Sequence, residues 1–440
     1  MWLNDYNGEA MFTIIKFIEV VITSILIIDF IKTLYKNKVI INVRWCAYYV
    51  FQVIFIIPNL IMLLYGKLNL YSYGYKFIVN NWQVEIIYSI FIIFTYCMLK
   101  REAKKTKNSF EFNNISNLKI KIPAMVILIA FAGTFVPLIM VLLSPQPYLY
   151  FRYFAIFERT DMINIVSSEA RKWHNGELNI SLFVGMISCV ILWVGSLNMK
   201  LDSRIILRLY LFIVGMEILL FSSKRTLGIF LFIIYLIADF LLKKKRPWIE
   251  FAFIVLGCIS YFIFYQSIVN KTIGGGVSSP VEMYIVYFSR ILDYRFISYS
   301  LLHPNQVKIL QYPCQSFLFD ILPFIKRTNW VNKPYPFGVY YTAAWTNTIV
   351  NSVNYRYTVS WFGEALANLS WIGLPVGYFL YSKMLSVFEK IKNPIVNIFS
   401  IYVAIYFMVT HVQSNYYNII ILALLYILIE KRLFARIFKK

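Results

Sequence analysis

Long apolar runs separated by short charged stretches recur along the whole chain. A helix needs about 20 apolar residues to cross a bilayer, and runs of that length predict about eleven spanning helices. The runs cover roughly residues 11–31, 45–64, 82–99, 122–143, 179–198, 205–221, 226–242, 248–267, 359–382, 395–411 and 417–430. The pattern predicts an all-α, polytopic membrane protein that forms a single integral membrane domain over residues 1–440.

The composition agrees with this pattern. Hydrophobic residues make up 60% of the chain and charged residues 15%, whereas soluble domains carry about 25% charged residues. The formal net charge of +22 would suggest nucleic acid as a partner of a soluble protein. Because Lys and Arg lie mainly in short loops here, membrane orientation and lipid headgroups explain the charge better. We therefore expect the lipid bilayer, and no nucleic acid, as a partner.

Basic residues alternate strongly between successive loops. The stretches 32–44, 100–121 and 243–246 and the tail after residue 430 are rich in Lys and Arg. Because short basic loops stay in the cytoplasm, the N-terminus is predicted outside and the C-terminus inside. Two substantial loops then lie outside, at 144–178 and 268–358. The second is too long for a simple connection, and Arg290 and Arg295 in its apolar stretch predict a helix on the outer membrane surface.

The apolar run from Arg356 to Ser382 predicts one helix that crosses the membrane. Gly373 and Gly377 form a GxxxG pair, which allows another helix to approach closely. Polar residues recur at a spacing of four and predict a stripe on the helix, formed by Arg356, Ser360, Glu364 and Asn368. A carboxylate in an apolar helix is costly. Glu364 is therefore either functional or paired with an Arg that holds helices together, and the sequence leaves both open.

A short basic turn, FSSKRTLG, lies between two apolar runs at 221–228. The loop alternation places Lys224 and Arg225 outside, against the inside-positive trend. Arg offers two parallel donors and Lys a point charge, so the turn is suited to binding phosphate. The alternative is that both cations reach lipid headgroups of the outer leaflet. The five cysteines form no CxxC pair or Cys/His cluster, so we expect no metal site, no cofactor and no disulfide framework.

Three features of the chain together resemble the Wzy-type polymerases of O-antigen and capsule repeat units, which are related in architecture to the O-antigen ligases. They are the Ser-Lys-Arg turn, the long outer loop with several Arg, and the following GEALANLSWIGLPVG stretch. SSKRTLG is similar to an S-x-R-G-type motif, with Lys224 intervening and Thr226 where Gly often stands. FGEALANLSWIGLPVG is similar to a GE-x-x-x-N-x-G-x-x-G-type signature, with Ser370 and Trp371 displacing the first Gly. The resemblance covers about residues 220 to 382.

The resemblance implies metal-independent glycosyl transfer on the outer face of a bacterial cytoplasmic membrane. The expected substrates are oligosaccharide repeat units on undecaprenyl diphosphate, with a chain-length regulator and a flippase as further partners. A diphosphate leaving group needs nearby cations, and an acceptor hydroxyl is helped by a base. Arg225 and Lys224 are therefore expected to bind the diphosphate. Further sugar or phosphate contacts are expected from Arg290, Arg295 and Arg356.

Two more residues complete the expected site. Glu364 is expected as the base or as the group that orients an Arg, with Arg225, Arg290, Arg295 or Arg356 as its partner in an outward-open cavity. His411, in the polar stretch THVQSN, can exchange a proton near neutral pH, and its alternative role is that of a hydrogen-bonding interfacial histidine.

Other classes of protein remain open at this point. An O-antigen ligase or another lipid-sugar transferase is the nearest enzyme alternative. A flippase or exporter of lipid-linked oligosaccharides would also be polytopic and basic, although it is expected to place cations in a central cavity. A scaffold without catalysis is the remaining class. The sequence gives neither the sugar, the linkage, the chain length nor the oligomeric state.

Overall fold

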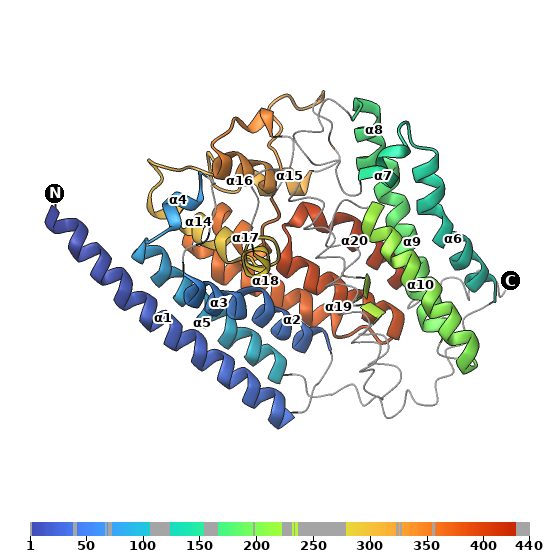
Figure 1. Cartoon of the computed structure of the whole chain (residues 1–440), viewed down its shortest axis with the longest axis horizontal. Coiled ribbons are helices and arrows are strands. Elements are labelled where there is room, and N and C mark those ends of the chain that lie inside the picture. Colours follow the sequence, from blue (N-terminus) through green and yellow to red (C-terminus); the bar gives the residue numbers. More distant parts are fainter. Residues whose placement is uncertain are drawn as a thin grey trace. The chain divides into compact units, whose positions relative to one another are not determined.

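A computed structural model describes residues 2–37, 42–66, 68, 73–105, 124–153, 166–196, 199–221, 231–232, 234–235, 279–322, 325, 328–353 and 357–427. Helix makes up 81% of it, and no strand occurs among these residues (Figure 1). The predicted all-α fold class is therefore confirmed for the described part of the chain.

Five helices are long and apolar enough to cross a membrane. They are Ala10–Lys36, Val43–Tyr65, Trp82–Lys104, Ala124–Leu142 and Ser168–Gly195. The first four agree with predicted runs, whereas the fifth begins at Ser168 instead of 179, so part of the predicted loop 144–178 belongs to a helix. Several helices are thus long and apolar enough to cross a membrane, as the sequence predicts for a membrane protein. The number eleven stays a prediction, and the runs 226–242 and 248–267 lie almost wholly outside the described residues.

The chain divides into two compact units, residues 110–269 in one and residues 1–109 with 270–440 in the other. The smaller unit contains α6 (Ala124–Leu142), α7 (Tyr148–Tyr153), α8 (Ser168–Trp173), α9 (Asn179–Gly195) and α10 (Leu201–Phe221). Helix α6 packs closely on α9: a Cβ atom at Gly133 would lie 2.2 Å from the Ser188 hydroxyl, and one at Gly185 would lie 2.6 Å from the Pro137 ring. Small residues at such crossings let two helices approach.

The larger unit begins with α1 (Trp2–Asn37), the Val43–Tyr65 span and α5 (Trp82–Lys104). The span consists of α2 (Val43–Phe51), a π-helical turn and α3 (Ile57–Tyr65). Arg44 ties the ends of three helices together through ion pairs of 3.2 Å to Glu102 and 2.9 Å to Glu389. The core is rich in aromatic rings, and Phe91 stacks on Tyr294 with ring centres 3.8 Å apart.

The rest of the larger unit is built from shorter helices. They are α4 (Tyr75–Ile78), α13 (Pro280–Met283), α14 (Ile291–Leu302), α15 (Gln315–Ile321), α16 (Phe337–Thr346), α17 (Trp361–Leu369), α18 (Gly373–Phe388), α19 (Pro394–Val409) and α20 (Val412–Leu425). Figure 1 shows α14, α17 and α18 together near the middle of this unit.

The predicted single helix over 359–382 is wrong, because the chain turns back within it. Helix α17 ends at Leu369, Ser370 adopts a positive φ of 55°, and α18 begins at Gly373. A Cβ atom at Gly373 would lie 2.0 Å from the Ala365 carbonyl oxygen, and the Trp361 indole donates a 2.8 Å hydrogen bond to the Gly377 carbonyl. The two helices therefore form an antiparallel hairpin. The close approach predicted at the GxxxG pair is confirmed, and the helix that approaches is α17.

The predicted surface helix is also wrong, because α14 lies in the core of the larger unit. Every described residue from Ile291 to Ser300 except Asp293 is buried. The chain that leads to α14, residues 279–290, begins beside the end of the Val43–Tyr65 span, where the Ser279 and Tyr65 hydroxyls lie 3.2 Å apart. Arg290 N–H donates to the Ile54 carbonyl at 3.3 Å, midway along the same span. Helix α14 then runs back toward α4, where the ring centres of Tyr299 and Phe77 lie 5.1 Å apart, so the chain turns back on itself at Arg290. Burial of the apolar face outweighs the charge of its two Arg, which find partners inside.

Candidate functional site

Three interruptions of helices meet at one place in the larger unit. Helix α14 begins after Arg290, α17 begins after extended residues 357–360, and α20 begins after Thr410 and His411. Val412 N–H donates to Glu364 Oε2 at 2.8 Å, and Arg290 Nε donates to the Val409 carbonyl at 2.8 Å. Irregular backbone at membrane depth occurs where protein buries it or where it lines a cavity. We call residues 289–290, 360–364 and 409–412 the helix-break centre and take it as the candidate site.

Glu364 is fully buried in this centre. Its Oε1 accepts a 3.1 Å hydrogen bond from the Ser316 hydroxyl, and its Oε2 accepts the bond from Val412. Asn368, one turn further along α17, donates to the Ser316 hydroxyl at 2.8 Å and accepts from the Ser316 amide at 3.1 Å. Ser360 caps α17 by accepting from Gly363 N–H at 3.1 Å. Two members of the predicted stripe, Glu364 and Asn368, therefore lie on the same side of α17 and contact the same residue, Ser316.

The expected Arg partner of Glu364 is not Arg290 or Arg295. Within the described ranges no Lys or Arg forms an ion pair with Glu364, and both of these Arg bind elsewhere. Arg225, Lys224 and Arg356 lie outside the described residues, so their roles stay predictions. The carboxyl group of Asp320 on α15 shares a hydrogen bond with that of Glu364 instead.

Asp320 also contacts α20. The Tyr416 hydroxyl donates to its carbonyl oxygen and, at 3.2 Å, to its Oδ1. Burial raises the pKa of the Asp320 carboxyl to about 6. Sequence reasoning missed this residue because it lies in a loop with no repeating pattern, and only the fold of α15 against α17 brings it to Glu364.

Arg290 and His411 lie at the backbone turn between α19 and α20, residues 409–412. Arg290 is buried, donates to the carbonyls of Val409 and Ser289 at 2.8 and 2.7 Å, and lies 3.8 Å from Asp293 Oδ2. His411 is the N-cap residue of α20, is 4% exposed, and has Nε2 3.3 Å from the Ser414 hydroxyl. The structure therefore brings Arg290, Glu364 and His411 together around residues 409–412.

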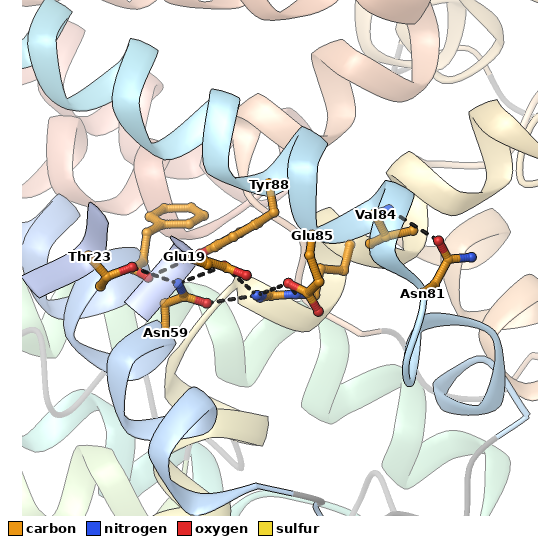
Figure 2. A network of polar contacts seen from close by, with 9 residues as sticks. Glu19, Thr23, Asn59, Asn81, Val84, Glu85 and Tyr88 are labelled. Carbon is orange, nitrogen blue, oxygen red and sulfur yellow. Dashed lines mark hydrogen bonds and ion pairs between the residues drawn. The ribbon is translucent and has the colours of Figure 1, made fainter. Parts of the chain in front are cut away.

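Arg295 on α14 lies in a separate buried cluster, and Figure 2 shows its partners Glu19, Asn59, Glu85 and Tyr88. Its Nη2 donates to Glu85 Oε2 at 2.6 Å, to Asn59 Oδ1 at 2.7 Å and to Glu19 Oε1 at 3.0 Å. The guanidinium carbon lies 3.9 Å from the centre of the Tyr88 ring. The cluster joins α14 to α1, α3 and α5, and every charged member is at least 95% buried.

The geometry of this cluster fits a structural clamp. The guanidinium is engaged by two carboxylates, an amide and an aromatic face, so a substrate contact by Arg295 stays a prediction without support from its surroundings. Sequence reasoning missed Glu19 and Glu85, although each is a carboxylate inside a predicted apolar run. The rule that singled out Glu364 would have found both.

No family model, curated protein or solved structure matches this chain. In the described part of the chain, no group of three or more His, Cys, Asp or Glu side chains is placed to hold a metal ion. The helix-break centre itself offers the carboxyls of Glu364 and Asp320, the guanidinium of Arg290 and the imidazole of His411.

Proposed function

We propose that this protein polymerises lipid-linked oligosaccharide repeat units on the outer face of a bacterial cytoplasmic membrane. The substrate would be an oligosaccharide on undecaprenyl diphosphate, and the reaction a metal-independent glycosyl transfer. The observation that carries the proposal is the position of Glu364. The stretch that resembles the polymerase signature supplies this residue to the helix-break centre, beside the turn that Arg290 and His411 contact.

The chemistry of the reaction is compatible with these groups. The growing chain leaves a diphosphate, which carries several negative charges, and joins a hydroxyl of the incoming unit. A cation such as Arg290 would stabilise the leaving group, and a carboxylate or imidazole would accept the hydroxyl proton. Lys224, Arg225 and Arg356 would add positive charge. In this proposal the N-terminus lies outside and the C-terminus in the cytoplasm, with a flippase and a chain-length regulator as partners.

Analysis of surface polysaccharide from a deletion strain tests the proposal. Loss of a polymerase leaves single repeat units attached to the final anchor. Loss of a ligase leaves long chains that are not attached. Re-expression of the intact gene should restore the ladder of chain lengths, and a deletion strain with an unchanged ladder would reject the proposal.

Transport of the lipid-linked unit is the second candidate. It is favoured by interrupted helices that meet midway along a span, an arrangement typical of secondary transporters. The two functions separate in spheroplasts of the deletion strain. A lost transporter keeps the lipid-linked units inaccessible to an added glycosidase, whereas a lost polymerase leaves them accessible and unpolymerised.

A further inference from the structure

One face of α15 is turned toward Glu364. Ser316 and Asp320 are four residues apart, so their side chains lie on the same side of this helix. Ser316 donates to Glu364 Oε1 at 3.1 Å, and Asp320 meets the same carboxyl group. Cys314 N–H, just before α15, donates to the Asn368 carbonyl at 2.9 Å. The contact is therefore fixed by backbone as well as side chains.

Two carboxyl groups in hydrogen-bonding contact cannot both be ionised at low cost. Two neighbouring carboxylates repel each other where protein excludes water, and one carboxyl of such a pair then keeps a proton. The proton supplies the donor that the hydrogen bond between the two groups needs. It also explains how Glu364 can be fully buried with neither Arg290 nor Arg295 as its partner.

We propose that Asp320 and Glu364 hold one proton between them and titrate as a unit, with Asp320 as a positioning residue for Glu364. The role of Glu364 as a base rests on the proposed function, but the sharing of the proton does not. The proton also affects the contact between α15 and α17. The shared proton fastens α15 to α17, and its loss would leave two negative charges facing each other at this contact.

The neighbours of the pair support the direction of its titration. Tyr416 on α20 is the titratable group that donates to Asp320, and burial raises the pKa of Asp320 to about 6. His411 precedes the amide that binds Glu364, and Arg290 contacts Val409 on the same turn. A carboxyl whose pKa is raised by folding stabilises the protein at low pH. That contribution is lost as the pH rises through the raised value.

Thermal unfolding of the purified full chain between pH 5 and pH 8 tests the pair without any substrate. The melting temperature of the unsubstituted protein should fall across this range, and Asp320→Asn should remove a part of the fall on the order of 2 °C. The Asn amide N–H replaces the shared proton as a permanent donor. Glu364→Gln should flatten the curve in the same way, because its amide donates to Asp320.

The controls separate this effect from general loss of stability. Glu169 is exposed on α8, and Glu169→Gln should leave the slope with pH unchanged. If Asp320→Asn and Glu364→Gln keep the full slope of the unsubstituted protein, the shared proton is disproved. If either variant fails to fold, the slope of melting temperature with pH in the other variant, compared with that of Glu169→Gln, still tests the shared proton.

Polymer formation supplies the readout for positioning. With the proposed function, Asp320→Asn should shift the pH dependence of polymer formation toward lower pH, because Glu364 then ionises without the neighbouring negative charge. An unchanged pH profile would refute the positioning role. Failure of the proposed function would show differently, as a normal chain-length ladder in the deletion strain together with altered melting curves.

Discussion

Glu364 is the residue at which the polar stripe, the candidate site and the carboxyl contact coincide. It is fully buried, and its three described partners come from α15 and α20. Glu364→Gln keeps the size and most hydrogen bonds of the side chain but removes its basicity. If Glu364 is the base, this change should lose most polymer formation while the protein still inserts.

Glu364→Ala is the matched comparison for this prediction. It removes the hydrogen bonds too, so both polymer formation and melting temperature should fall. Polymer analysis and unfolding in detergent are measured on the same preparations. Appreciable polymer formation by Glu364→Gln, with loss of it in Glu364→Ala, would show that the residue acts as a structural strut and not as the base.

Arg295 gives a second prediction at the scale of single residues. Arg295→Met leaves the carboxyls of Glu19 and Glu85 buried without their guanidinium partner. Breaking such a pair from one side costs about 3–5 kcal/mol, so the melting temperature should fall strongly. Arg295→Lys should restore little, since a point charge cannot reach two carboxylates and an amide as a planar fork does.

Arg101 offers a control for this change. It is an exposed cation at the end of α5, and Arg101→Met should alter the melting temperature by only a small amount. If Arg295→Met melts like Arg101→Met, the clamp contributes little to stability and Arg295 becomes a better candidate for a substrate contact.

Among the elements, the hairpin of α17 and α18 depends on the absence of a side chain at Gly373. A Cβ atom there would lie 2.0 Å from a carbonyl oxygen of the backbone, which cannot move aside as a flexible side chain could. Gly373→Ala should therefore destabilise the protein by about 1–3 kcal/mol, measured by unfolding in detergent. Gly176→Ala is the control, because no atom lies within 4 Å of its added Cβ. Equal melting temperatures would contradict the hairpin.

Helix positions could be predicted from the sequence wherever a run of apolar residues ends at charged ones. The start of α5 at Trp82 and the end of α10 at Phe221 follow from such boundaries, since lipid and water select opposite residues. The other two limits do not, because α5 continues past the predicted end at 99 to Lys104 and α10 begins at Leu201 instead of 205. The break at Ser370 could not be predicted in this way, because apolar residues continue on both sides of it. Pro375 could have indicated that a new helix begins here, because it lies in the first turn of α18, where a missing N–H costs no hydrogen bond.

Only part of the candidate site could be predicted from the sequence. Glu364 stands out because an isolated carboxylate in an apolar run is costly, and that test is local in the sequence. Its partners could not be inferred, because Asp320 and Val412 reach it only through the packing of α15 and α20. The burial of α14 was missed because its Arg residues find acceptors on distant helices.

For the whole molecule, orientation is the prediction on which the proposed function depends. In a background without the five native cysteines, a cysteine at Ser279 should react with a membrane-impermeant thiol reagent in intact cells, and one at Thr106 should not. Labelling after permeabilisation shows that both positions are present and reactive. Reversed labelling would place the long loop in the cytoplasm and remove the proposed outer-face reaction.

The clamp around Arg295 has a consequence for the order in which the molecule is made. Arg295 follows Glu19 by 276 residues and Glu85 by 210. While the ribosome synthesises the residues in between, the N-terminal helices already carry their acidic side chains in the bilayer. Those side chains must wait in a protonated form, or in water, until α14 emerges. The first helices of the chain are therefore completed by a segment from its second half, and an N-terminal fragment that stops before residue 280 should be a preferred target for membrane proteases.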